Sequence, residues 1–257
     1  MRIFVVKKGT LIRAAVFVLL IIGAIVYTQV ALGEAAPVSN QSGPMPICSV
    51  STDEKVVALT IDTAFGDTDF TQQILDVLRN ESVRATFFVM GLWADEYSDK
   101  LGDIFTGGHE IASHSMEHKR YPDLTANEVL EDAAGAADLL FNQTGYDTKL
   151  IRLPFGAFNP ESISALENGG YIPIKWSLDS KDWKGYDANK IAEGVLSEVG
   201  SGDIIMFQNN MAATPEALSL IILGLREQGY KLVTVSDLLL DGDYIVDAEG
   251  TQRYFQD

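Results

Sequence analysis

The chain has 257 residues, 47% of them hydrophobic and 21% charged, a length that permits one α/β barrel or two smaller domains. Its 19 basic residues stand against 36 acidic ones, giving a net charge of −17, so we predict no nucleic-acid partner and attribute the acidity to solubility. The single cysteine, Cys48, excludes an internal disulfide and is predicted to have no structural role.

The N-terminal 33 residues have the pattern of a membrane anchor or a secretion signal. The first 14 include four basic residues and no acidic one, and residues 14–32 then run without a charge. About 20 apolar residues span a bilayer, whereas the apolar part of a signal peptide is usually about 7–15 residues long. We therefore expect a single-pass anchor in the cell membrane, with the rest of the chain outside the cytoplasm. Cleavage near residues 30–33 would instead give a secreted protein.

Residues 34–54 are rich in proline, serine and glycine, so they are predicted to be a linker before a domain of residues 55–257. Within this domain, strand-like runs alternate with amphipathic helical runs. The predicted strands are residues 56–61, 85–90, 109–113, 150–153, 171–177, 203–207 and 231–235. The predicted helices are residues 70–80, 92–105 in part, 127–141, 188–199 and 215–228, with a further helix starting at 159–160. Thr125 and Glu128 have capping-box spacing before the helix at 127–141.

About seven strand–helix cycles predict a parallel sheet with helices outside it, either as a closed barrel or as a doubly wound sheet. The first strand is not followed by a GxGxxG motif, and the sequence has no Walker-type lysine. Because these phosphate-binding signatures are typical of nucleotide-binding doubly wound sheets, their absence favours the barrel.

The segment 113–118 (SHSMEH) holds two of the three histidines, His114 and His118. On one helical turn, residues four apart lie on the same face, so both imidazoles would reach one point. Neutral imidazole is the commonest protein ligand for zinc and similar ions. The spacing therefore indicates a metal site, and the alternative is two surface histidines that happen to be close.

Other polar residues follow the predicted strands, which is where the reactive groups of such barrels collect. They are Asp62, His114, His118, Arg152, Asp179, Asp182 and Gln208. An Asp beside a two-histidine metal site can act as general base for a metal-bound water, and a nearby Arg would lower the pKa of that Asp. Taken singly, each has an ordinary structural explanation, such as a helix cap, a rim salt bridge or a turn.

Five segments, in the same order, resemble the motifs of the NodB-type polysaccharide deacetylases, a family of metal-dependent carbohydrate esterases, over roughly residues 55–240. Residues 58–62 (ALTID) are similar to the opening T-F-D-D-G motif, in which the first Asp is the catalytic base. Residues 114–118 (HSMEH) match H-[S/T]-x-x-H, the two histidine ligands of the metal. Residues 64–66 (AFG) resemble the A-W-G of a sporulation-associated branch.

The later motifs complete the resemblance. Residues 152–156 (RLPFG) are similar to R-x-P-[F/Y]-G, which lines the groove and supplies an Arg and a backbone oxyanion donor at Phe155. Residues 176–183 (WSLDSKDW) are similar to the W-x-x-D-x-x-D-W segment that supports that Arg. Residues 204–208 (IIMFQ) align with the last motif, L-x-H, whose histidine is the general acid.

The resemblance implies a distorted (β/α) barrel of about seven strands, here preceded by the N-terminal transmembrane helix, and a divalent metal, with zinc expected. It assigns three sets of residues. The catalytic residues would be Asp62, Arg152, Asp179 and Gln208, the substrate-binding residues Phe155, Trp176 and Trp183, and the metal-binding residues His114, His118 and Thr63.

Two motif positions depart from the family pattern. Thr63 replaces the second Asp, the third metal ligand, and its neutral hydroxyl would weaken metal binding unless Asp67 or Asp69 substitutes. Gln208 replaces the last histidine, and an amide cannot donate a proton as a general acid near neutral pH. The first hypothesis is a metal-dependent hydrolase that removes N-acetyl groups from a cell-envelope polysaccharide, either peptidoglycan or a chitin-like glycan.

The second hypothesis is a catalytically impaired protein on the same fold that binds or scaffolds glycan, because a fold does not guarantee an activity. A third alternative is a metal-binding sensor or transport module.

Overall fold

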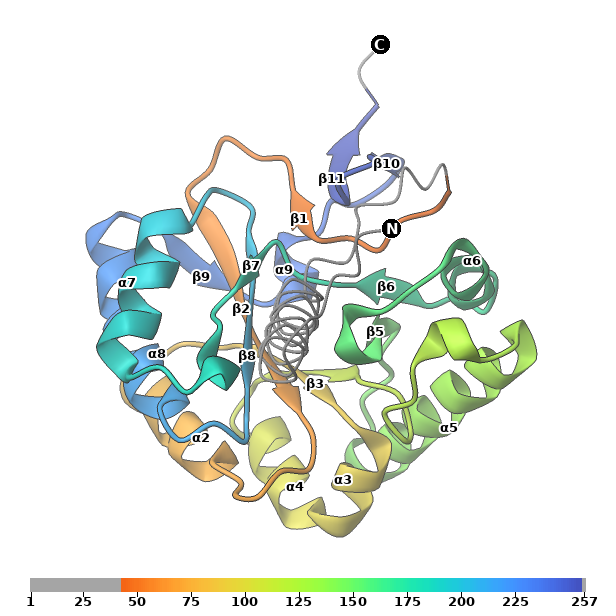
Figure 1. Cartoon of the computed structure of the whole chain (residues 1–257), viewed down its shortest axis with the longest axis horizontal. Helices are drawn as coiled ribbons and strands as arrows, with labels where there is room; N and C mark the ends of the chain where they lie inside the picture. The colour runs from red at the N-terminus through yellow and green to blue at the C-terminus, as the bar shows by residue number, and fades with distance from the viewer. Residues whose placement is uncertain (1–42, 256–257) are drawn as a thin grey trace, which may run out of the picture. The chain divides into compact units, whose positions relative to one another are not determined.

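The structure, a computed structural model, describes residues 43–255, and its main element is a curved sheet of seven parallel strands (Figure 1). Their order across the sheet is β6-β5-β4-β3-β2-β8-β7, and β9 (Lys231–Val233) pairs in addition with the first half of β2. The seven strands are β2 (Val56–Thr63), β3 (Thr86–Val89), β4 (Glu110–Ser113), β5 (Leu150–Arg152), β6 (Ile172–Ile174), β7 (Leu178–Asp179) and β8 (Ile204–Gln208).

The barrel predicted from the sequence is therefore a half-barrel. Its edge strands, β6 and β7, follow each other in the chain but are not paired with each other in the described sheet. The predicted strand at 171–177 stops at Ile174, and residues 175–177 leave the sheet between the two edges. The parallel α/β architecture with about seven strands is confirmed, although β7 was not among the predicted strands.

Helices follow the strands, and most of them cover the convex face of the sheet, whereas Val235 and Leu238 of the short helix after β9 belong to the cluster on the inner face. The predicted capping box is present: the Thr125 hydroxyl accepts from the Glu128 N–H, and the Glu128 carboxylate accepts from the Thr125 N–H. The helices are α2 (Thr71–Asn80), α3 (Gly91–Glu96), α4 (Ser98–Thr106), α5 (Ala126–Thr144), α6 (Pro160–Asn168), α7 (Ala188–Glu198), α8 (Thr214–Glu227) and α9 (Val235–Leu238).

Strand alternation divides the core into an outer and an inner layer. On β2, Val57, Leu59 and Ile61 pack with the outer helices, whereas Ala58 belongs to a separate inner cluster. Because side chains alternate along a strand, Asp62 lies on the same face as Ala58. The inner face is therefore apolar at the start of β2 and becomes charged at its end.

The folded domain begins before residue 55, which corrects the predicted boundary and linker. β1 (Ser49–Val50) pairs with β11 (Thr251–Tyr254), which also pairs with β10 (Tyr244–Val246). Ile47 and Val50 are buried in the inner cluster. Cys48 is buried as well, and its Sγ packs so closely on Gly250 that a Cβ at position 250 would clash with it. The prediction that Cys48 has no structural role is therefore wrong.

The predicted anchor or signal (residues 1–33) and the first part of the predicted linker lie outside the described residues. Within residues 43–255, no helix combines the length and apolar character that a membrane crossing requires.

Candidate active site

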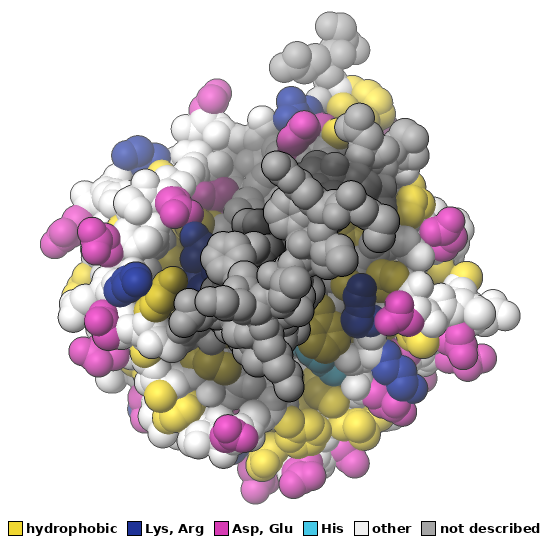
Figure 2. All heavy atoms as spheres, viewed as in Figure 1, with side chains coloured by type: hydrophobic (Ala, Val, Ile, Leu, Met, Phe, Trp, Pro, Cys, Tyr) yellow, Lys and Arg dark blue, Asp and Glu magenta, His cyan; other side chains and the backbone are white. Residues whose placement is uncertain are grey.

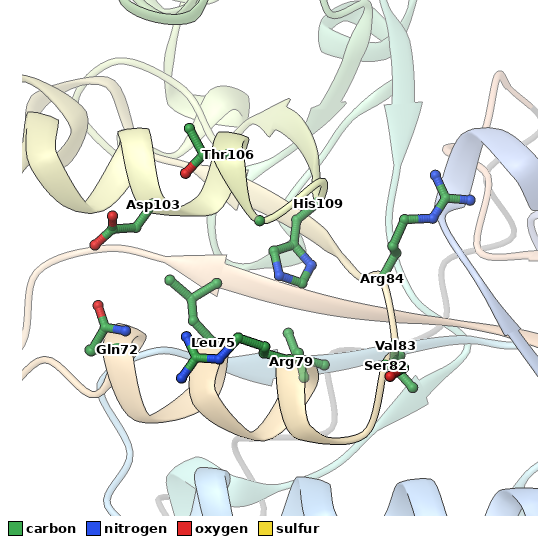
Figure 3. Close-up of a pocket in the computed structure, with 11 residues that line it drawn as sticks. Gln72, Leu75, Arg79, Ser82, Val83, Arg84, Asp103, Thr106 and His109 are labelled. Carbon is green, nitrogen blue, oxygen red and sulfur yellow. The ribbon is translucent and has the colours of Figure 1, made fainter.

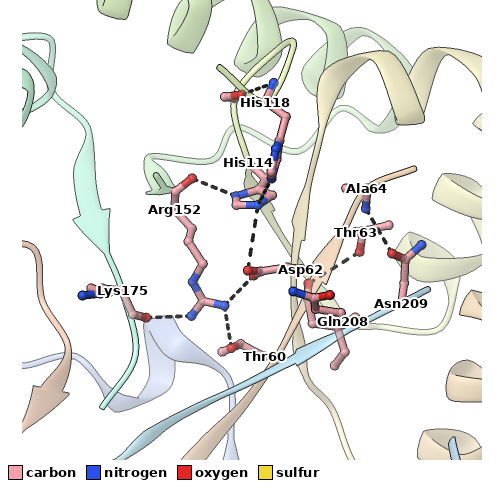
Figure 4. Close-up of polar contacts among 12 residues, drawn as sticks. Thr60, Asp62, Thr63, Ala64, His114, His118, Arg152, Lys175, Gln208 and Asn209 are labelled. Atoms are coloured by element: carbon pink, nitrogen blue, oxygen red, sulfur yellow. Dashed lines mark hydrogen bonds and ion pairs between the residues drawn. The ribbon is translucent and has the colours of Figure 1, made fainter. Parts of the chain in front are cut away.

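The carboxylate of Asp62 lies at the centre of a buried polar cluster at the C-terminal ends of the strands (Figure 4). Arg152, at the end of β5, donates from Nη1 to Asp62 Oδ1 at 2.6 Å and to Thr60 Oγ1 at 2.7 Å. Its Nη2 donates to the Lys175 carbonyl at 2.7 Å, and its guanidinium lies 3.9 Å from the centre of the Phe88 ring. These contacts fix the fully buried guanidinium, which in turn fixes the Asp62 carboxylate.

His114 and His118 converge as predicted, but not on a helical turn. Residues 114–120 form an irregular loop after β4, in which Ser115 and His118 adopt left-handed backbone conformations with φ of 66° and 59°. The Ser115 hydroxyl accepts from the His118 N–H at 2.7 Å and closes the bend. The two Nε2 atoms lie 3.1 Å apart.

The surroundings of the pair keep both imidazoles neutral. Burial lowers the pKa of His114, and burial together with the adjacent His114 lowers the pKa of His118 to about 4. His114 Nδ1 lies 2.9 Å from the Arg152 carbonyl, which can only accept, so Nδ1 carries the proton and the Nε2 lone pair faces the site. The approach of His114 Nε2 to Asp62 Oδ2, 3.8 Å, is therefore a contact rather than an ion pair.

The imidazole pair suits two positions around a divalent ion. Two nitrogens that each bind tetrahedral zinc at about 2.0–2.1 Å are about 3.3 Å apart, close to the observed spacing. Thr63 is buried, and its hydroxyl lies 3.5 Å from the Ile61 carbonyl. Residues 43–255 contain no group of three His, Cys, Asp or Glu side chains arranged for an ion. The two imidazoles are therefore the strong ligands of the site, and the Thr63 hydroxyl bonds to its own strand rather than to them.

The two acids suggested as substitute ligands are placed differently. Asp69 accepts from Lys100 at 2.8 Å, from Trp93 Nε1 at 2.9 Å and from Asn209 Nδ2 at 3.1 Å. Burial raises the pKa of Asp69, but these and other hydrogen bonds outweigh it and hold the pKa below its usual value. Its carboxylate is therefore committed to holding the β2–α2 loop, and Asp67 is exposed on that loop.

Gln208 ends β8 directly opposite Asp62 in the strand register, which is the position expected from the last motif. Its N–H donates to Asp182 Oδ2 at 2.9 Å, and the buried Asp182 also accepts from the Thr214 hydroxyl. Burial raises the pKa of Asp182 to about 6. Of segment 176–183, which was predicted to support Arg152, Trp176 contacts the guanidinium. Asp179 accepts instead from the Lys181 N–H and Trp183 Nε1.

The three predicted substrate-binding aromatics differ in accessibility. Phe155 is 65% exposed, its ring centre lies 4.5 Å from that of His118, and its φ of 61° is a strained conformation for a side chain of this size. Trp183 is 40% exposed. Trp176 is half-buried beneath Arg152 and against Gly156, so it supports the site by packing. In Figure 2, the visible histidine lies among hydrophobic side chains.

Sequence reasoning missed several partners in the cluster. Thr60 lies two residues before Asp62 on the same strand face, so the alternation of β2 could have identified it. Asn209 accepts from the Ala64 N–H and donates to Asp69, linking the ends of β8 and β2. The Lys175 carbonyl gives no sequence signal, because every residue carries a carbonyl.

A separate cavity of about 480 Å³ lies between α2 and α4 at the opposite, N-terminal ends of the strands (Figure 3). Leu75, Val83 and His109 are among the buried residues that line it. It contains none of the predicted site residues, so it is distinct from the cluster around Asp62.

The half-barrel with a carboxylate and an imidazole pair at its strand ends has the architecture of the NodB-type carbohydrate esterases. The sequence model of the polysaccharide deacetylase family matches residues 49–174. The chain is 32% identical over 195 residues to a peptidoglycan-N-acetylglucosamine deacetylase of Bacillus cereus, covering 74% of this chain and 91% of that one. The chain belongs to the polysaccharide deacetylase family.

Two further relatives bear on activity. The peptidoglycan-N-acetylmuramic acid deacetylase PdaC of Bacillus subtilis is 33% identical over 190 residues, which are 74% of this chain but only 40% of that protein. A crystal structure of a CE4 family pseudoenzyme from Bacillus anthracis superposes with a TM-score of 0.72 and 28% identity, covering 76% of this chain and 69% of that one. A mutant of that pseudoenzyme has restored enzymatic activity. The fold thus occurs in this family both with and without catalysis.

Proposed function

We propose that this protein removes N-acetyl groups from a cell-envelope glycan, either peptidoglycan or a chitin-like polymer. The observation that carries the proposal is the Asp62 carboxylate, held by the buried Arg152 beside the converging imidazoles of His114 and His118. A fixed carboxylate can act as the general base in the hydrolysis of an amide, and two neutral imidazoles beside it can bind a metal ion. The two Bacillus relatives named for peptidoglycan deacetylation support the substrate class.

In this mechanism Asp62 accepts the proton of the attacking water, while the hydrogen bond from Arg152 orients the carboxylate. His114 and His118 would hold a divalent ion, expected to be zinc, and Thr63 occupies the family position of a third ligand; such an ion would supply Lewis-acid polarisation of the acetyl carbonyl. The Phe155 N–H stabilises the developing oxyanion. Because the Gln208 amide does not titrate, the departing amine takes its proton back from Asp62 or from solvent.

A second candidate is a glycan-binding or scaffolding protein that has lost catalysis. Thr63 and Gln208 specifically favour it, since they remove a carboxylate ligand and a titratable acid from the family pattern. The Bacillus anthracis pseudoenzyme gives it a precedent on this fold. Both candidates place the glycan at the Asp62 cluster and differ only in whether acetate is released.

Acetate release from N-acetylglucosamine oligomers and from peptidoglycan, with added zinc, tests the proposal. We expect slow release by the wild type and a loss of at least about 10²-fold in Asp62→Asn, the scale of a missing general base. Chelation should abolish release and zinc should restore it. Circular dichroism checks that each variant is folded. Glycan binding without any acetate release by the wild type would reject the enzyme and favour the second candidate.

We further propose that the domain acts outside the cytoplasm, attached to the cell membrane through residues 1–33. The uncharged run at 14–32 with its basic flank supports this location. Fractionation of cells followed by protease treatment of intact spheroplasts tests it. The domain should sediment with membranes and be degraded from outside, whereas a protected cytoplasmic protein would contradict the proposal.

A further inference from the structure

Phe65 is an exposed aromatic residue on the β2–α2 loop, at the aromatic position of the A-W-G-like segment 64–66, and no role has yet been assigned to it. It is 44% exposed and comes three residues after Asp62 in the chain. It therefore lies at the same C-terminal edge of the sheet as the reaction centre. Phe155 and Trp183 are exposed at this edge as well. An isolated exposed aromatic needs no explanation, but one built rigidly into the edge of a site does.

The backbone on both sides of Phe65 is fixed by two asparagines that follow β8. The Asn209 side chain accepts from the Ala64 N–H at 3.1 Å, and Asn210 Nδ2 donates to the Phe65 carbonyl at 3.0 Å. The next residue, Gly66, packs so closely that a Cβ there would lie 2.6 Å from Asn210 Cβ. The loop thus holds Phe65 in place before any ligand binds, which lowers the entropic cost of binding.

The ring of Phe65 is supported from one side. Its centre lies 6.0 Å from that of Tyr97, and the Tyr97 ring lies 5.4 Å from that of Trp93. Trp93 is fully buried and donates through Nε1 to Asp69 at 2.9 Å. Tyr97 therefore backs Phe65 with an anchored aromatic stack, and almost half of the Phe65 surface is left to solvent.

The position of Phe65 relative to Phe155 defines the size of a ligand that would contact both. Phe155 follows β5 and Phe65 follows β2, and β4 and β3 lie between these strands. Three strand spacings of about 4.8 Å correspond to about 14 Å along the edge of the sheet. This span exceeds the length of one sugar ring and is suited to several linked sugars, and His114 follows β4, one of the strands between β5 and β2.

We propose that Phe65 forms a second sugar-stacking subsite, which makes the groove selective for an oligosaccharide or polymer over a mono- or disaccharide. The inference rests on the proposed glycan substrate. Pyranose rings carry an apolar C–H face that packs on an aromatic ring, and the neutral Phe65 side chain offers only that kind of contact. The ligand class is a chain of N-acetylated hexosamines bound across the strand ends.

Binding measurements on the full-length protein in detergent test the subsite without requiring catalysis. The probes are N-acetylglucosamine oligomers of two and five units, titrated by calorimetry into wild type, Phe65→Ala, Phe65→Trp and the control Phe141→Ala. Phe141 is 50% exposed but lies on α5. We expect Phe65→Ala to bind the pentamer about tenfold more weakly, the size of one aromatic hot spot. Its affinity for the dimer should change less than about twofold.

Phe65→Trp should bind both oligomers as the wild type does, and so should Phe141→Ala. Unchanged pentamer affinity in Phe65→Ala, with the wild type binding normally, would overturn the subsite and leave the proposed function intact. An equal loss for dimer and pentamer would also overturn it, because Phe65 would then act by supporting the reaction centre. A wild type that binds neither these oligomers nor soluble peptidoglycan strands would reject the proposed function and the subsite together.

Discussion

Arg152 is the residue on which the geometry of the cluster depends, since it contacts Asp62, Thr60 and the carbonyl of Lys175 without any exposure to solvent. Replacing it by Met leaves the buried Asp62 carboxylate without its charged partner, which typically costs about 3–5 kcal/mol of unfolding free energy. The double variant Asp62→Asn with Arg152→Met should recover most of that loss. Urea unfolding measures both. A single variant within about 1 kcal/mol of wild type would contradict this role of the pair.

The sequence identified the residues at the centre of the cluster, but it predicted few of the contacts between them. Asp62 and Arg152 lie at strand ends, and His114 and His118 come after one, so the periodicity of the chain located them. The pairing of the histidines, however, depends on two left-handed backbone conformations that residue spacing does not reveal. The assigned role of Asp179 failed because a carboxylate in a tight turn satisfies itself with nearby N–H groups.

The segment before residue 55, which includes β1, determines where the folded domain begins. Ile47 and Val50 are 3% and 2% exposed, and burial of each is worth about 1.5–3 kcal/mol. A chain that begins at residue 43 should therefore be more stable than one that begins at 55 by at least about 3 kcal/mol. Thermal and urea unfolding of the two truncations compares them directly. Equal stability would show that β1 is dispensable and return the boundary to residue 55.

His109 makes the contact between the starts of β3 and β4 sensitive to pH. It is buried, and its Nδ1 accepts from the Ala85 N–H at 3.3 Å. Burial, with a contribution from the positive charge of Arg84, lowers its pKa to about 4, against about 6.5 in the unfolded chain. The unfolded state thus binds the proton more readily, so this contribution to stability is present at neutral pH and is lost as the pH falls towards 4.

Unfolding free energies of wild type and His109→Asn at pH 7.5 and pH 5.0 measure this effect. The wild type should lose about 2 kcal/mol more than the variant between the two pH values. Asp182 changes the stability with pH in the opposite direction, because burial raises its pKa to about 6. This residue is present in both proteins, so its effect cancels in the comparison. Identical losses in the two proteins would contradict the neutral, buried state of His109.

The elements that could not be predicted from the sequence are short, and they pair with segments that are distant in the chain. The long periodic runs, such as 56–61 and 127–141, correspond to β2 and α5. In contrast, β1 has two residues, and its partner β11 lies about 200 positions away, so no local pattern marks it. Segments of two to four residues carry too little periodicity to be identified alone.

The sequence predicted the parallel α/β class of the whole molecule, but it did not predict that the sheet stays open between β6 and β7. The opening between β6 and β7 arises because residues 175–177 leave the sheet, and this exit also turns the Lys175 carbonyl towards Arg152. The Lys175 N–H meanwhile donates to the carbonyl of Ile47, so the N-terminal segment and the site are joined at one residue. The incomplete barrel and the geometry of the active site therefore have a common cause.

We propose that Asp62, His114 and His118 form the reaction centre of a glycan deacetylase that lacks only a third ligand and a titratable acid. The direct measurement is zinc-dependent acetate release from an N-acetylglucosamine oligomer by wild type and by the double variant Thr63→Asp with Gln208→His. We predict tighter zinc binding and a faster rate, by up to about 10²–10⁴-fold, since the variant regains a carboxylate ligand and a general acid. An equal or lower rate in a folded double variant would contradict the claim.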